Sequence, residues 1–252
     1  MVYKNVKYRK DSGIVWITIN RPDVMNALNP ATLSEIKAAV QDAGKDNDIG
    51  VVVITGTGRA FSTGVDLIAL GDRKLERGRV GPILDEPAGE LINAIQVLPK
   101  VVIAMVNGYC LTGALEIVLA CDLIVASEQA RFGDTHGRWG FRPSWGMSQR
   151  LPRLIGILKA KEMSFTADMI TAQEAERIGL ANMVVPAEKL EETVRGLAAK
   201  IMGNSPKTVA AIKYLYNQGM KDTLEKGLEL EAKSEFDIAD TEERLKSFRK
   251  KD

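Results

Sequence analysis

Short runs of β-branched and aliphatic residues recur along the first half of the chain, and segments with helical character separate them. The runs are IVWITIN at 14–20, VVVIT at 51–55, VVIAMV at 101–106 and DLIVA at 122–126. Because successive positions are apolar, both faces of these strands must be covered, which is typical of a buried and largely parallel sheet. The sequence therefore predicts an α/β core.

Two segments connect these strands in different ways. Asn29 and Pro30 supply an N-cap and a first-turn proline for a helix whose apolar residues continue at helical spacing to Ala43. The segment 71–90, GDRKLERGRVGPILDEPAGE, instead mixes charge with four glycines and two prolines. Its composition predicts an irregular and mobile excursion beside a functional site.

From residue 144 onward the pattern becomes mainly helical. Its helix signals are a capping box at Thr171 and Glu174, a Ser205-Pro206 start, and a long, charged, periodic stretch at 221–248. The one strand predicted here is NMVV at 182–185. The expected organisation is an α/β region at 1–190 followed by a helical region at 191–252.

Composition and charge argue against several classes of partner. The 34 basic and 33 acidic residues give a net charge of +1, so no overall field favours nucleic acid or an anionic membrane. The apolar runs are too short to cross a bilayer, and the N-terminus lacks the apolar run of a signal peptide. We therefore expect a cytoplasmic protein without a nucleic-acid or membrane partner.

The cysteines and the histidine limit redox and metal chemistry. Cys110 and Cys121 are the only cysteines. If the connection between them is mainly helical, they lie roughly 16 Å apart at about 1.5 Å per residue, beyond disulfide reach. We expect both to be reduced and buried. With one histidine, two cysteines on distant turns and no HExxH motif, the sequence offers no metal ligand set.

Two segments share a strand, a glycine-containing turn and then a helix, namely 51–70 and 101–123. Each carries a glycine, Gly64 or Gly113, near the point where its helix should begin. Helix N-termini leave backbone N–H groups free, and two that converge make a site for a developing oxyanion. Taken singly, each turn is better explained as an ordinary tight turn. Neither matches a nucleotide-binding loop.

Glu116 lies three residues after Gly113 in an otherwise apolar run, ALEIVLACDL. Burial of a carboxylate without a partner is costly, and it raises the pKa toward that of a working acid or base. The alternative is a glutamate on the one solvated edge of the helix. Apolar neighbours on both sides favour a functional role.

His136, within RFGDTHGRWG, is the only histidine in the chain. If this segment is extended, Asp134 and His136 point to the same side, and the carboxylate would fix the tautomer of the imidazole. A lone histidine is more often structural, so the residues alone leave its role open. The nearby aromatic residues either line a pocket or pack in the core, and they are Trp139, Phe141 and Trp145.

Four segments in a fixed order resemble the crotonase superfamily, the enoyl-CoA hydratase/isomerase family. They are NRPDVMNAL at 20–28, AFSTGVDL at 60–67, NGYCLTGALEIVLACDLIVAS at 107–127 and TAQEAERIGLANMVVP at 171–186. The resemblance implies a crotonase-like spiral of ββα units and a C-terminal helical region that forms a homotrimer or a hexamer of two trimers. It also implies an acyl-CoA thioester substrate, without a further cofactor.

The same motifs imply a binding groove. By position, Val65 and Gly113 would supply the two N–H groups of an oxyanion hole for the thioester oxygen. Ala27, Asp66 and Leu67 would lie along the groove that binds coenzyme A.

The motifs also imply the acid-base groups. Glu116 matches the first of two glutamates that handle water in family hydratases. The second glutamate stands in a motif like FGxPE, whereas this chain reads FGDTH. His136 therefore occupies the second catalytic position, with Asp134 as a possible orienting group.

The leading hypothesis is reversible hydration of a trans-2-enoyl-CoA thioester. Glu116 would take a proton from water, and His136 would hold that water or protonate the α-carbon, which predicts a pH–rate limb that vanishes in His136→Ala. One alternative is double-bond isomerisation by Glu116 alone; another is a thioester reaction on a bulky or cyclic substrate shaped by Trp139 and Trp145. A CoA-binding protein without catalysis is disfavoured by the presence of both turn glycines and Glu116.

Overall fold

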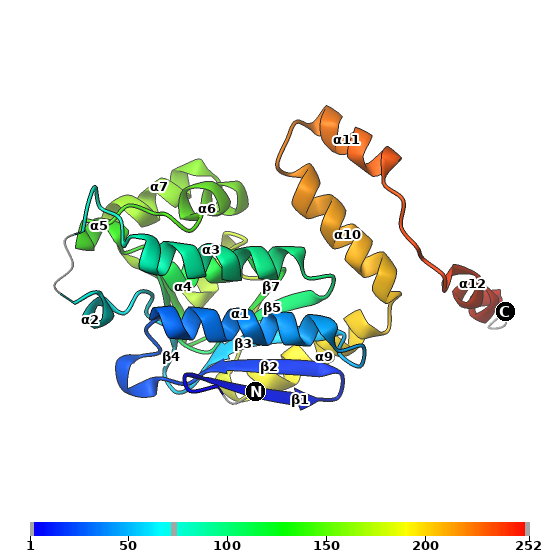
Figure 1. Cartoon of the computed structure of the whole chain (residues 1–252), viewed down its shortest axis with the longest axis horizontal. Helices are drawn as coiled ribbons and strands as arrows, with labels where there is room; N and C mark the ends of the chain where they lie inside the picture. The colour runs from blue at the N-terminus through cyan, green and yellow to red at the C-terminus, as the bar shows by residue number, and fades with distance from the viewer. Residues whose placement is uncertain (1–2, 72–74, 250–252) are drawn as a thin grey trace.

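The computed structural model describes residues 3–71 and 75–249 of the chain, and within them the strands form two sheets (Figure 1). The larger sheet contains β1 (Val6–Asp11), β2 (Ile14–Ile19), β3 (Val51–Gly56), β5 (Val101–Val106), β7 (Leu123–Ser127) and β10 (Met183–Val185). Its order is β1-β2-β3-β5-β7-β10, and only β1 runs antiparallel to its neighbour. The predicted strands therefore form the predicted, largely parallel sheet.

The smaller sheet was not predicted. It contains β4 (Ala60–Ser62), β6 (Tyr109–Leu111), β8 (Arg131–Gly133) and β9 (Met169–Thr171), in the order β4-β6-β8-β9. The expectation of a single strand after residue 144 was wrong because β9 is a second one. Its three residues are too few for a sequence pattern, and β9 owes its existence to antiparallel pairing with β8, as in Phe132 opposite Ile170.

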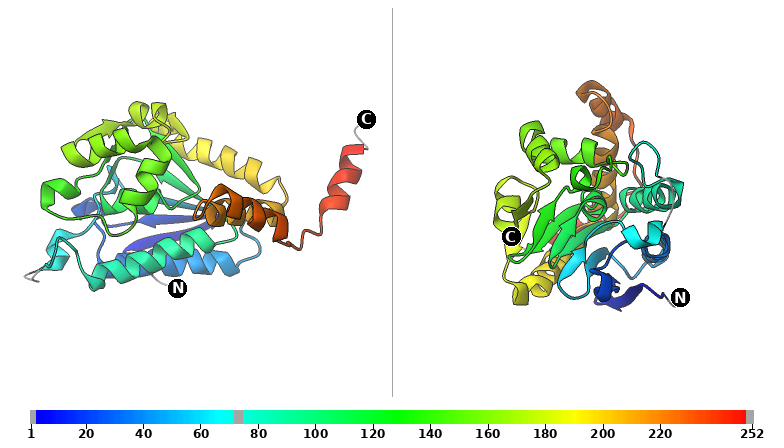
Figure 2. Two further views of the ribbon diagram at one scale, coloured as in Figure 1. Left: turned by 90° about the horizontal axis from the view of Figure 1, so that it is seen from above. Right: turned by 90° about the vertical axis from the view of Figure 1, so that its left-hand side faces the viewer.

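Helices cover both faces of the larger sheet (Figures 1 and 2). Alternate side chains of each strand point to opposite faces. Val52 and Ile54 pack in one core cluster with α1 (Pro30–Lys45) and α3 (Pro82–Val97), whereas Val51 and Val53 pack in the other with α9 (Leu190–Met202). The sheet is thus buried on both sides, as its apolar runs predicted.

The predicted helix caps are present. Asn29 Oδ1 accepts the N–H of Thr32 at 2.8 Å at the start of α1. Thr171 Oγ1 likewise accepts the N–H of Glu174, although the Glu174 carboxylate pairs with Arg177 rather than closing the box. The short helices around the smaller sheet and the site are η1 (Pro22–Val24), α2 (Leu67–Leu70), α4 (Gly113–Val118), α5 (His136–Trp139), α6 (Met147–Ile155), α7 (Ile157–Thr166), α8 (Ala172–Arg177) and η2 (Ala187–Lys189).

The expected excursion at 71–90 is shorter than predicted. Residues 72–74 lie outside the described residues, but α3 already begins at Pro82 and includes Pro87. Proline has no backbone N–H, and the first helical position loses nothing by this because an N–H there would have no partner within the helix. Its φ also suits a helix, so Pro82 starts the helix that the neighbouring glycines concealed. Val80 lines the cavity described below, which places this connection beside the site.

The predicted helical stretch at 221–248 is interrupted. It forms α11 (Leu224–Lys233) and α12 (Thr241–Arg249), and the residues between them are not helical. Phe236 packs edge-on against Tyr214 of α10 (Pro206–Gly219), and Asp240 accepts a hydrogen bond from Ser205 at 2.7 Å. These long-range contacts override the local periodicity. Beyond them α12 stands apart from the body of the molecule (Figures 1 and 2).

Both cysteines are free thiols, as expected, but their setting differs from the prediction. Cys110 is buried in β6, whereas Cys121 is partly exposed just after α4. The connection between them is only partly helical. None of the helices in the described parts of the chain has the length and apolar character to cross a bilayer.

Candidate active site

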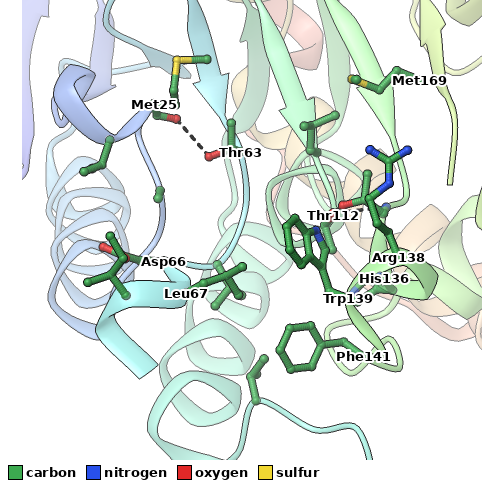
Figure 3. A pocket seen from close by; sticks show the side chains of 17 residues that line it. Met25, Thr63, Asp66, Leu67, Thr112, His136, Arg138, Trp139, Phe141 and Met169 are labelled. Carbon is green, nitrogen blue, oxygen red and sulfur yellow. Dashed lines mark hydrogen bonds between the residues drawn. The ribbon is translucent and has the colours of Figure 1, made fainter. Parts of the chain in front are cut away.

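A cavity of about 510 Å³ opens between the turns that follow β4, β6 and β8 (Figure 3). Many of the residues expected from the sequence line it directly: Ala27, Val65, Asp66, Leu67, His136, Trp139 and Phe141. The other expected residues do not line it and are almost fully buried: Gly113, Glu116, Asp134 and Trp145. The structure thus brings one set together at the cavity and a second set behind it.

The two glycine turns lie against each other at the cavity. Gly64 has a φ of +88°, and an ideal Cβ on it would lie 2.8 Å from the carbonyl oxygen of Leu111 and 3.2 Å from the Gly113 nitrogen. Only glycine fits there without displacing the facing backbone. Within the described residues, neither the Val65 nor the Gly113 N–H has a hydrogen-bond acceptor in the protein. The turns therefore leave two donors available in one place.

The groove beside Val65 is fixed by an ion pair that the sequence did not reveal. Arg21 Nη1 lies 2.9 Å from Asp66 Oδ2 and also donates to the carbonyl of Ala27. Asp66 Oδ1 caps α2 by accepting the N–H of Ala69 at 3.1 Å. Both oxygens of the Asp66 carboxylate thus have partners within the protein. Arg21 links the segment at Ala27 to the segment at Asp66, and both were expected to bind coenzyme A. Leu67 begins α2 and lines the cavity.

Glu116 projects from α4 and is only 1% exposed. Its Oε1 accepts the N–H groups of Trp145 and Met147, each at 2.9 Å, and its Oε2 lies 3.6 Å from His136 Nε2. Burial raises the pKa of Glu116, and the Met147 N–H, the imidazole and the Trp145 N–H oppose that rise. The apolar sequence around Glu116 correctly indicated a buried carboxylate.

His136 is held by Asp134, but not through an extended segment. His136 begins α5, and a turn brings its Nδ1 to 2.6 Å from Asp134 Oδ1. The contact is present although the extended backbone, on which the sequence argument was conditional, is not. Ser164 donates to Asp134 Oδ2 at 2.6 Å. Burial would raise the pKa of Asp134, but the hydrogen bonds from His136 and Ser164 hold it below its ordinary value. An ionised carboxylate can only accept, so Nδ1 carries a proton, and Nε2 faces Glu116.

Trp145 supports Glu116 instead of lining the cavity. An ideal Cβ on Gly113 would lie 2.5 Å from Trp145 Cζ3, so the indole packs on that glycine. The indole N–H donates to Asp85 at 3.0 Å, and Arg150 donates to the Trp145 carbonyl at 2.9 Å. These contacts aim the Trp145 N–H at Glu116. By contrast, Trp139 is 57% exposed and its ring projects into the cavity (Figure 3).

Several residues at the site were not identified from the sequence. Thr112, Thr135 and Arg138 line the cavity, and Ser164 reaches Asp134 from α7. No local pattern distinguishes a hydroxyl that bonds a residue 30 positions away. Thr112 carried one available signal, because it stands immediately before Gly113 in a turn.

The described parts of the chain contain no group of three or more His, Cys, Asp or Glu side chains that could hold a metal ion. The expectation that the protein uses no metal stays a prediction.

Comparison with known proteins identifies the family. The family model for enoyl-CoA hydratase/isomerase matches residues 9–251. The chain is 36% identical over 244 residues to a short-chain-enoyl-CoA hydratase of Clostridium acetobutylicum, covering 96% of this chain and 92% of that protein. It is 39% identical over 227 residues to a probable peroxisomal enoyl-CoA hydratase of Arabidopsis thaliana, covering 90% and 83%. The chain therefore belongs to the enoyl-CoA hydratase/isomerase family.

Solved structures agree with this assignment. The crystal structure of an enoyl-CoA hydratase from Bacillus anthracis superimposes with a TM-score of 0.90 at 33% sequence identity, covering 98% of this chain and 97% of that one. The crotonase-like α/β fold with a helical C-terminal region, which the motifs implied, is thereby confirmed.

Proposed function

We propose that the protein is an enoyl-CoA hydratase that reversibly adds water across the double bond of a 2-enoyl-CoA thioester. One observation carries the proposal: the Oε2 atom of Glu116 and the Nε2 atom of His136 face each other at 3.6 Å. This separation is too long for a direct hydrogen bond, and a water molecule beside both atoms would have an acceptor and a donor. Family membership supports the same chemistry.

The reaction assigns a separate proton to each group. Glu116 takes one proton from water as the hydroxide oxygen bonds to the β-carbon, and electrons move onto the thioester oxygen. The N–H groups of Val65 and Gly113 stabilise that oxygen, and each such donor contributes about 3–4 kcal/mol. His136 acts in its imidazolium form: Nδ1–H stays bonded to Asp134, and Nε2 gives its proton to the α-carbon. A proton passing from Glu116 to His136 then restores the starting state.

The coenzyme A portion would lie along Ala27, Asp66 and Leu67, and no further cofactor takes part. Trp139 and Phe141 line the cavity and favour an acyl group large enough to contact aromatic rings.

The C-terminal region, 191–252 in our division of the chain, would join three subunits, as a homotrimer or as two stacked trimers. Its support is a set of exposed apolar side chains on α10, on α11 and at the turn between them: Tyr216, Met220, Leu224 and Leu228. A cytoplasmic location accords with two free thiols, because disulfides are rare in reducing compartments.

The test is turnover of crotonyl-CoA, followed as loss of the absorbance of the conjugated thioester. We expect wild-type protein to form the 3-hydroxyacyl thioester, and His136→Ala to lose about 100-fold or more in kcat. A shift of the double bond without addition of water would instead indicate isomerisation by Glu116. Binding of coenzyme A without turnover of crotonyl-CoA or of bulkier enoyl thioesters would indicate a protein that lacks catalysis.

A further inference from the structure

Thr112 has a backbone conformation that β-branched residues rarely adopt. Its φ is +52° and its ψ is −114°, in the left-handed half of conformational space that favours glycine. Thr112 is buried, lines the cavity and immediately precedes Gly113. Residues held in such conformations persist only where surrounding contacts determine them, and they gather at functional sites.

The contacts of Thr112 reach both acid-base groups. Its N–H donates to the carbonyl of Gly133 at 2.8 Å, and its carbonyl accepts the N–H of Glu116 at 3.0 Å. Its hydroxyl oxygen lies 2.5 Å from Thr135 Oγ1 and accepts the Thr135 N–H at 3.3 Å. Because Thr135 precedes His136, one hydroxyl pair joins the turn after β6 to the turn that carries the imidazole.

Thr112 also lies close to the other glycine turn, the one at Gly64. An ideal Cβ on Gly64 would lie 3.4 Å from Thr112 Cβ, and Gly64 precedes Val65. Three groups of the proposed mechanism are thus directly linked to Thr112 or to Thr135: Gly113 and His136 are the next residues in the chain, and the Glu116 N–H bonds the Thr112 carbonyl. The Val65 N–H is linked less directly, through Gly64.

We propose that Thr112 is a positioning residue. Its hydroxyl pair with Thr135 fixes the Gly113 N–H relative to the His136 imidazole, so that one bound thioester meets the oxyanion donor and the proton donor together. Glycine would adopt this backbone without strain but could not form a hydrogen bond with the Thr135 hydroxyl. The hydrogen bond therefore accounts for a threonine at a position that favours glycine. A misplacement of about 1 Å costs up to about 100-fold in rate. The inference rests on the proposed hydratase function.

Three variants of Thr112 separate the hydroxyl from the backbone. Thr112→Ser keeps the hydroxyl, Thr112→Val keeps the shape without it, and Thr112→Gly relieves the strain without it. With crotonyl-CoA we expect kcat to fall about 10- to 100-fold in Thr112→Gly and Thr112→Val, with KM changed less than about threefold. Thr112→Ser should stay within about threefold of wild type in both parameters. The matched control is Ser12→Gly, which relieves a positive φ of +53° in the hairpin between β1 and β2 and should leave kcat unchanged.

The melting temperature tests whether a fall in kcat comes from loss of stability. In Thr112→Gly, relief of strain and loss of the hydroxyl bond oppose each other, so the melting temperature should stay within about 4 °C of wild type. A fall in kcat at an unchanged melting temperature then reflects misalignment and not unfolding.

A second measurement does not depend on turnover. His136 is the only histidine, so NMR of ¹⁵N-labelled protein gives a single pair of imidazole nitrogen signals. We expect the Nδ1 proton to exchange slowly in wild type and Thr112→Ser, and faster in Thr112→Gly and Thr112→Val. Wild-type kcat and an unchanged imidazole signal in Thr112→Gly would overturn the inference and leave the hydratase function standing. If the imidazole signal changes in Thr112→Gly but wild-type protein hydrates no enoyl thioester, the hydratase function is overturned and the positioning of His136 by Thr112 stands.

Discussion

Among the residues that the structure describes, two buried pairs of charged side chains differ in how their facing atoms meet. Lys213 of α10 is 9% exposed, and its Nζ donates to the carbonyls of Ile95 and Lys100 at 2.9 Å and to Asp122 Oδ2 at 2.7 Å. An ammonium group has three N–H donors, so each has an acceptor. Asp122 in turn accepts the N–H of Val102. This pair fastens α10 to the body of the protein.

Glu116 and His136 are also buried, but their facing atoms form no direct hydrogen bond. Their facing atoms are 3.6 Å apart, and His136 borders the cavity. Burial raises the pKa of both Asp122 and Glu116, so a shifted carboxyl does not by itself separate a structural pair from a reactive one. The absence of a direct hydrogen bond between the facing atoms, at the edge of the cavity that the site residues line, does separate them, and substitutions in the two regions should fail in different ways.

The largest expected effect is on turnover. Glu116→Gln should lower kcat by about 100- to 10,000-fold, because the amide cannot take a proton from water. Its oxygen can still accept the N–H groups of Trp145 and Met147, and the variant removes a charge whose burial is costly. The melting temperature should therefore not fall. Steady-state kinetics with crotonyl-CoA and thermal unfolding check both halves of the prediction.

Retention of more than a tenth of wild-type kcat in Glu116→Gln would remove Glu116 as the base. A large fall in melting temperature would instead mean that its charge stabilises the fold, which would make the two buried regions alike.

The second effect is on stability. Lys213→Met should lower the free energy of unfolding by about 3 kcal/mol, because it leaves the partly buried Asp122 carboxylate without its cation. The kcat of the folded fraction should stay unchanged, since Lys213 does not border the cavity. Denaturant unfolding at neutral pH measures the first quantity, and kinetics at low temperature measure the second.

A matched double variant tests the cause of that loss. Adding Asp122→Leu to Lys213→Met removes both charges and should recover most of the lost stability, because apolar replacements of a buried ion pair are often neutral. If the double variant is less stable than Lys213→Met alone, the Val102 N–H or the packing of α10 is the dominant contribution, and not the unpaired carboxylate.

The comparison also shows what the sequence could reveal. The strands of the larger sheet could be predicted because consecutive apolar residues indicate burial on both faces. Glu116 could be predicted as a buried carboxylate because its immediate neighbours are apolar. Lys213 did not, since its acceptors come from segments about a hundred residues away. The break between α11 and α12 depends on Phe236 meeting Tyr214 in the same way. A local sequence pattern predicts structure that depends on neighbouring residues. It does not predict a contact whose partner comes from a distant segment.

Within the site, the motif placed His136 correctly but not its supports. Asp134 was predicted from spacing, yet its other partner, Ser164, lies on a helix that had no visible connection to the site. Trp145 was grouped with the other aromatic residues, although its ring packs on Gly113 while theirs line the cavity. Aromatic composition alone does not tell which side of a turn a ring will occupy.

The smallest effect is a difference in sign between two carboxyl groups of the site. The pKa of Asp134 is lowered in the folded protein, so its stabilising contribution is present above the ordinary aspartate range and is lost as pH falls through the folded pKa. The pKa of Glu116 is raised, so its contribution is full below the ordinary glutamate range and is lost as pH rises through the folded pKa.

Denaturant unfolding of Asp134→Asn and Glu116→Gln across acid to neutral pH should reveal these opposite signs. Relative to wild type, Asp134→Asn should become less stable as pH rises from acid through the aspartate range. Glu116→Gln should become more stable as pH rises through the glutamate range and beyond. Parallel profiles would mean that the carboxyl groups of Asp134 and Glu116 titrate together and not as two independent groups.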